Sequence, residues 1–142
     1  MKVILMIIFG GFLFSVNSQT VEKTLDKKLL GPFSCEKKLK INVETNDTTM
    51  SCYCTYQNRE YSHITDLGII GLYRESDRDE LVKNIKMCLP YMENKSDSFS
   101  VGRFKIYDFS KNLYFTSSTK EYTFIDKKRC LKWLEWLENL TF

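Results

Sequence analysis

An apolar segment at the start of the chain predicts that the protein is exported, and an exported protein can be stabilised by disulfide bonds. Residues 1–18 begin with a positive charge at Lys2, continue as an apolar run, and end in small residues before Gln19. This is the three-part pattern of a cleaved secretory signal peptide. The run is too short to cross a bilayer, which takes about 20 residues. We therefore expect residues 1–18 to be removed and residues 19–142 to form a single extracellular domain.

The charge balance of that domain excludes some classes of partner. The whole chain has 21 basic and 18 acidic residues, and loss of Lys2 leaves 20 against 18, a net charge of +2. This balance is too even to predict nucleic acid or an anionic surface as the main partner. No later segment is apolar enough to cross a membrane, so we expect no transmembrane span. The chain contains no alanine, so its helices must be held by packing.

We expect the cysteines of such a domain to form disulfide bonds, because the secretory compartment is oxidising. There are five, so two disulfides and one odd thiol are expected: Cys35, Cys52, Cys54, Cys88 and Cys130. On a strand, Cys52 and Cys54 would face the same way, and each would need a different distant partner. We expect Cys88 and Cys130, on predicted helices, to be those partners. Cys35 is then left as a buried thiol or as a disulfide bridge to a second copy.

Three Asn-x-Ser/Thr sequons for N-glycosylation are consistent with an extracellular protein. They begin at Asn46, Asn94 and Asn139. Asn46 lies at a polar break between two alternating segments, and Asn94 lies in a loop after Pro90, so a glycan on either could stand in water. Asn139 is close to the end of the chain and is the weakest of the three. We therefore expect a glycoprotein.

Catalytic and metal-binding side chains are scarce. His63 is the only histidine, so a two-histidine acid–base pair is impossible, and no Gly-x-Ser-x-Gly motif supplies a serine nucleophile. The acidic cluster over 75–80 alternates with arginines at a helix start, where acids satisfy exposed amide groups. A zinc site would need a second ligand pair besides Cys52 and Cys54. We expect no enzyme activity, no metal and no cofactor.

Two periodicities predict an α+β fold. Alternation predicts strands over 39–43, 50–56, 103–109, 113–117 and 121–125, and a mainly apolar strand over 64–73. Helical spacing predicts a short helix over 20–30, a central helix from a capping box at Ser76 to Pro90, and a last helix capped by Asp126. Residues 93–100 are predicted to be a polar loop. We expect a small disulfide-stapled domain with antiparallel strands in two groups, a central helix and a C-terminal amphipathic helix.

The predicted strands and helices carry more aromatic residues than core packing alone requires. Tyr107, Tyr114 and Tyr122 fall on successive predicted strands, and alternate residues of a strand share a face. Trp133 and Trp136 lie three apart on the last helix, where an outward Trp136 would add a partner-facing edge. Tyrosine and tryptophan are enriched in binding hot spots. We therefore expect a secreted protein that binds an extracellular protein partner of unknown identity through these residues.

Two other functions stay open. The aromatic side chains could line a cavity between sheet and helices, and the protein would then carry a small apolar ligand. A secreted hydrolase would have to use His63 as its base. An enclosed cavity would favour the carrier, whereas an open aromatic patch would favour the binding protein.

Overall fold

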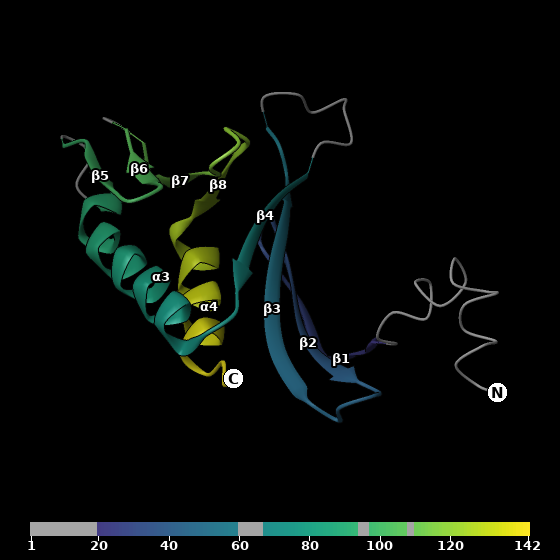
Figure 1. The fold of residues 1–142 in the computed structure, drawn as a ribbon. Coiled ribbons are helices and arrows are strands. Elements are labelled where there is room, and N and C mark those ends of the chain that lie inside the picture. Colours follow the sequence, from purple (N-terminus) through teal and green to yellow (C-terminus); the bar gives the residue numbers. More distant parts are fainter. Residues whose placement is uncertain (1–19, 60–66, 94–96, 108–109) are drawn as a thin grey trace, which may run out of the picture.

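A computed structural model of the 142-residue chain describes residues 20–59, 67–93, 97–107 and 110–142. It contains two sheets, each a run of four antiparallel strands in chain order (Figure 1). Sheet A consists of β1 (Thr20–Leu30), β2 (Phe33–Asn42), β3 (Thr48–Gln57) and β4 (Leu67–Leu72). Sheet B consists of β5 (Phe99–Val101), β6 (Phe104–Ile106), β7 (Asn112–Thr116) and β8 (Tyr122–Asp126).

A helix follows each sheet, which completes the predicted α+β class. Helix α3 (Glu75–Cys88) runs into the short 3-10 helix η1 (Leu89–Met92), and α4 (Lys127–Glu138) ends the chain. Figure 1 shows α4 between α3 and sheet A. The prediction of strands in two groups, a central helix and a C-terminal helix is confirmed.

The first segment is a strand, and the short helix predicted over 20–30 is wrong. β1 pairs antiparallel with β2 along its length, and Gly31 closes their turn with φ of 67°. Lys27 and Glu36 form a cross-strand ion pair at 2.7 Å. The segment is rich in lysine and leucine, which are good helix formers, so pairing with β2 overrides its local helix propensity.

The register of sheet A also decides the disulfide. β2 and β3 place Cys35 opposite Cys54, and these two cysteines are bonded, with Cα atoms 4.0 Å apart. Cys52, Cys88 and Cys130 are buried free thiols. The predicted pairing of Cys52 and Cys54 with Cys88 and Cys130 is therefore wrong, as is the prediction of Cys35 as the odd thiol. Chain spacing could not show this, because a cross-strand partner follows from the register of the hairpin.

The start of α3 lies earlier than predicted. Arg74 is the N-cap residue, and the Asp77 carboxylate accepts hydrogen bonds from the backbone N–H groups of Tyr73 and Arg74 at 3.0 and 3.1 Å. The predicted capping box at Ser76 is wrong, because Asp77 is close enough to satisfy the earlier amides. At α4 the prediction is confirmed: the Asp126 carboxylate accepts from the Arg129 N–H at 2.9 Å.

The predicted polar loop over 93–100 ends in a strand that the sequence analysis missed. Phe99 begins β5, which pairs with β6, and its ring stacks on Tyr91 of η1 with centroids 4.1 Å apart. Residues 98–101 do alternate polar and apolar side chains, but a strand of three residues is too short for alternation to predict it.

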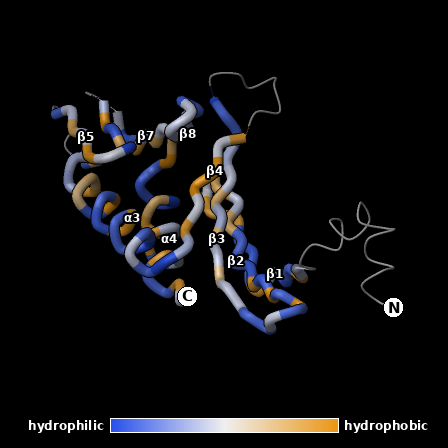
Figure 2. The backbone as a smooth tube through the Cα atoms, in the orientation of Figure 1, coloured by the Kyte–Doolittle hydropathy of each residue, from blue (hydrophilic) through white to orange (hydrophobic). Residues whose placement is uncertain are grey.

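One buried core joins the two sheets through α4. Trp133 is completely buried, stacks on Phe33 of β2 at 4.1 Å, and lies 6.4 Å from Phe104 of β6, measured between ring centroids. Phe115 of β7 packs edge-on against Tyr56 of β3 at 5.6 Å. Figure 2 shows hydrophobic residues along β4, in contrast to the hydrophilic stretches of β1 and β2. One face of each sheet packs in this core, and the other face of each sheet is exposed to solvent.

Candidate functional site

The outer face of sheet B carries the predicted tyrosines. Because strand residues alternate, Phe104, Leu113 and Phe115 point into the core, while the residues between them point outward. The outward aromatic residues are Tyr107, Tyr114, Tyr122 and Phe124, which we call the sheet B aromatic face. Tyr107 is 47% exposed and Phe124 is 36% exposed.

Tyr114 lies at the centre of this face. Its ring contacts Tyr107 edge-on at 4.9 Å and Phe124 at 5.6 Å, between centroids. Tyr107, Tyr114 and Tyr122 line one hollow of about 300 Å³ together with Thr116 and Lys120. The structure therefore brings together three residues that the sequence analysis selected from separate strands.

Basic side chains surround the sheet B aromatic face. The Lys105 Nζ lies 4.5 Å from the centre of the Tyr107 ring, and the Arg59 guanidinium carbon lies 5.4 Å from the centre of the Phe124 ring. Both are cation–π distances. Lys120 borders the hollow. Arg59 was not foreseen, because it comes from the segment after β3, far from sheet B along the chain.

The nearby described carboxylates have partners of their own. Glu121 accepts hydrogen bonds from the hydroxyl groups of Ser117 and Thr119, which lower the pKa of its carboxyl group. The backbone N–H of Arg129 lowers the pKa of Asp126 in the same way. Both carboxylates stay ionised, but Asp126 forms an ion pair with the Arg129 side chain at 2.8 Å, so the cations Lys105, Lys120 and Arg59 outnumber Glu121 at the described rim of the face.

The two tryptophans are core residues. Trp133 is fully buried and Trp136 is 7% exposed, and the Trp136 indole N–H donates to the Asp26 carboxylate at 3.0 Å. The prediction of an outward Trp136 is wrong, because β1 lies against α4 where the sequence analysis placed no strand. Neither tryptophan contributes an exposed edge, although Leu131 on α4 is 45% exposed.

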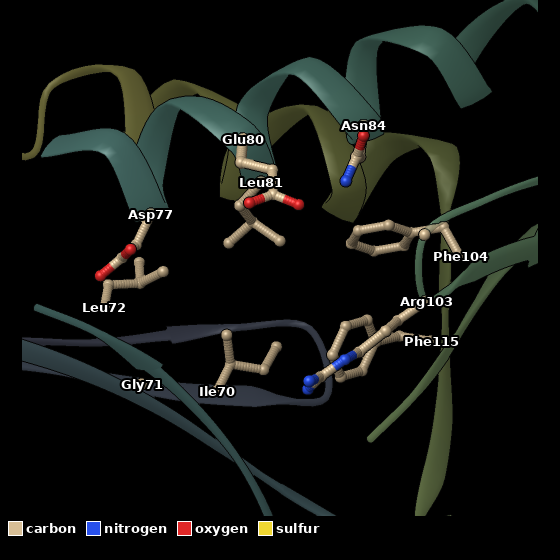
Figure 3. Close-up of a pocket in the computed structure, with 11 residues that line it drawn as sticks. Ile70, Gly71, Leu72, Asp77, Glu80, Leu81, Asn84, Arg103, Phe104 and Phe115 are labelled. Atoms are coloured by element: carbon tan, nitrogen blue, oxygen red, sulfur yellow. The ribbon is translucent and has the colours of Figure 1, made fainter. Parts of the chain in front are cut away.

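A second hollow, of about 350 Å³, separates β4 from α3 and sheet B (Figure 3), and we call it the β4 groove. Its walls are apolar over Ile70, Leu72, Leu81, Phe104 and Phe115. Glu80 and Asn84 of α3 and Arg103 of the β5–β6 turn extend into it. No sequence spacing predicts that these residues meet, because they come from elements distant along the chain.

The candidate glycosylation sites differ in their surroundings. Asn46 is exposed in the β2–β3 turn with φ of 57°. Asn139 is exposed after α4, and its side-chain amide donates to the Glu135 backbone carbonyl at 2.8 Å. Asn94 and His63 lie outside the described residues.

The three free thiols are poor nucleophiles. Burial raises the pKa of Cys52 to about 12, of Cys88 to about 11 and of Cys130 to about 12. A buried thiolate loses its hydration, so the protonated form is favoured. For Cys130 the neighbouring Cys88 adds to this effect. These side chains serve as small apolar core residues.

Among the described residues, no group of three or more histidine, cysteine or acidic side chains is placed to hold a metal ion. In the same part of the chain, no helix has the length and hydropathy needed to cross a membrane. No family model, curated protein or solved structure matches this chain. The chemistry of its surfaces is therefore what supports a functional assignment.

Proposed function

We propose that this chain is a secreted, non-enzymatic glycoprotein that binds the acidic surface of another extracellular protein through the sheet B aromatic face. The observation that carries the proposal is a cluster of exposed and half-buried rings centred on Tyr114, with cations at its rim. The N-terminal segment, the sequons and the Cys35–Cys54 disulfide support an extracellular address.

The aromatic rings supply binding energy at low entropic cost. Tyrosine buries a large rigid area and keeps a hydroxyl group for hydrogen bonding. Here the rings of Tyr107, Tyr114 and Phe124 already restrain one another in the free protein. Little side-chain freedom is therefore lost when a partner covers them.

The charges at the rim favour an acidic partner. Lys105 and Arg59 lie beside rings that a partner would cover, Asp126 is paired with the Arg129 side chain, and the ionised Glu121 is outnumbered by the nearby cations. Complementary charge of this kind steers encounter and selects among partners more than it adds affinity. A few rim cations beside rings suit an acidic protein surface better than the long track of phosphates in a nucleic acid.

The experiment starts with a photoreactive benzoylphenylalanine at position 107 of the glycosylated protein. Crosslinking in extracellular fluid identifies the partner, which is then purified for affinity measurements. We expect Tyr114→Ala to weaken binding by roughly 30-fold or more, as is usual for a hot-spot tyrosine. Tyr73→Ala is the matched control, because Tyr73 is 58% exposed directly after β4 and lies off this face.

The rim charges are tested with the same partner. Lys105→Gln is expected to reduce the association rate and to flatten its dependence on salt, because steering is electrostatic. An unchanged affinity for both Tyr114→Ala and Lys105→Gln contradicts the proposal. The proposal is also contradicted if the partner binds through an anionic glycan, so that digestion of this glycan alone abolishes binding.

The other two functions have less support. An apolar cargo needs an enclosed apolar cavity, whereas the β4 groove opens to solvent and has charged side chains at its rim. A hydrolase that uses His63 stays a prediction, and a His63→Ala protein with undiminished biological effect would remove it.

A further inference from the structure

We propose that the free edge of β4 accepts an extended segment of a partner protein as an additional strand of sheet A, with alternate side chains of that segment in the β4 groove. This site is separate from the sheet B aromatic face and does not depend on the function proposed for it.

The register of sheet A shows which β4 residues point their backbone groups outward. The Cα atoms of Cys35 and Cys54 are 4.0 Å apart, which is the short spacing of a non-hydrogen-bonded pair. Cys54 therefore directs its N–H and C=O toward β4, where its cross-strand partner is Ile70. By alternation, Ile69 and Gly71 direct their N–H and C=O away from the sheet.

Three other sheet edges are protected. β1 is rich in lysine and has a register shift between Thr24 and Asp26, two devices that discourage strand addition. β5 is only three residues long. On β8, the Tyr122 backbone C=O accepts from the Arg59 N–H at 2.9 Å and its N–H donates to the Asn58 side chain at 3.3 Å, so the residues after β3 cover the Tyr122 end of that edge.

Among the described residues, nothing gives β4 any of these protections. Its sequence, Leu67–Leu72, has no charge and no proline, and its register with β3 is continuous. Ile69 is 56% exposed beside the free edge. An uncharged, regular edge with unpaired N–H and C=O groups is the structure to which an extended peptide adds a strand.

The β4 groove provides a place for the side chains of such a peptide. Ile70, Gly71 and Leu72 line it and no β3 residue does, so the groove lies on the free-edge side of β4. Leu81 of α3 and Phe104 of β6 form its far walls (Figure 3). A strand paired with β4 would point every second side chain toward these apolar residues.

The rim of the groove suits a peptide with polar flanks. Glu80 and Asn84 extend from α3 on one side, and Arg103 extends from the β5–β6 turn on the other (Figure 3). Within the described residues, none of these three side chains forms a hydrogen bond or ion pair, so they are available to a ligand. Backbone pairing would supply affinity, and the apolar pocket with its opposite charges would supply specificity.

The test uses a phage-displayed library of random octapeptides, panned against the folded, glycosylated protein. Selected peptides are synthesised, and their dissociation constants are measured by fluorescence anisotropy. Ile69→Pro removes an outward N–H and leaves the β3 ladder intact, and we expect it to weaken binding at least about tenfold. Ile69→Thr is the matched control: it keeps the N–H, and we expect less than about a threefold change.

A second measurement needs no substitution. The amide protons of Ile69 and Gly71 should exchange quickly in the free protein and slowly in the peptide complex. Tyr114→Ala should leave peptide affinity unchanged, because Tyr114 points to the outer face of sheet B, opposite to Phe104 and Phe115 of the groove. The proposal is overturned if no peptide is enriched, if selected peptides bind Ile69→Pro as tightly as the wild type, or if protection falls outside β4. It is equally overturned if sedimentation shows a dimer that Ile69→Pro dissociates, because the occupant is then a second copy.

Discussion

At the scale of single residues, the Trp136 side chain shows how a hydrogen bond accompanies burial. Its indole N–H donates to the Asp26 carboxylate at 3.0 Å, between α4 and β1. We expect Trp136→Phe to lower the free energy of unfolding by about 2 kcal/mol, the usual value for a bond to a charged group. Urea unfolding of Trp136→Phe, Asp26→Ala and the double variant measures the coupling between the two side chains. Strict additivity of the two single changes would show that this bond contributes nothing.

The buried thiols make a second prediction at this scale. Because burial raises the pKa of Cys88 to about 11, its thiolate population at pH 8 is roughly a hundredfold below that of an ordinary cysteine. We expect Cys52, Cys88 and Cys130 to resist iodoacetamide in the native protein at pH 8 and to react fully in urea. Mass spectrometry of the alkylated peptides gives the result. Rapid labelling of native Cys88 would contradict the burial described here.

At the scale of elements, α4 depends on its N-cap. Asp126→Ala removes the acceptor for the Arg129 N–H, and we expect a loss of about 1 kcal/mol of stability. The pKa of Asp126 is lowered in the folded protein, so its contribution is complete above the ordinary carboxyl pKa of about 4. The contribution is lost as the pH falls through the lowered folded-state pKa.

Asp126→Asn separates charge from hydrogen bonding at the same cap. The amide keeps an acceptor, so this variant should retain most of the stability at pH 7 and should not share the acid-dependent loss. Urea titrations from pH 7 to pH 2 compare the three proteins. A pH dependence in Asp126→Asn equal to that of the wild type would exclude Asp126 as its source.

At the scale of the whole molecule, the disulfide is the one covalent constraint in the described residues. The Cys35–Cys54 bond closes a loop with a sequence separation of 19, for which loop entropy predicts about 3 kcal/mol. We expect the double variant Cys35→Ser, Cys54→Ser to unfold about 10 °C lower. Reduced wild-type protein should match the double variant, and a reductant should leave the variant unchanged. A further drop on reduction would reveal a second bridge.

Local patterns along the chain were enough for part of this structure. Alternation puts Tyr114 on the opposite face of its strand from Leu113 and Phe115, because the period of two is a property of any strand. The Asp126 cap is equally local, since its partner lies three residues away. The two strand groups and two long helices follow from the same short-range signals. These features required no knowledge of what packs against them.

Features that depend on distant partners were decided by the tertiary structure. β1 is a strand because β2 pairs with it, and Cys35 bonds Cys54 because the hairpin register sets them opposite each other. The burial of Trp136 and the β4 groove likewise need neighbours that are far along the chain. Spacing in sequence encodes the period of an element, but contact between elements depends on register and packing, which exist only once the chain has folded.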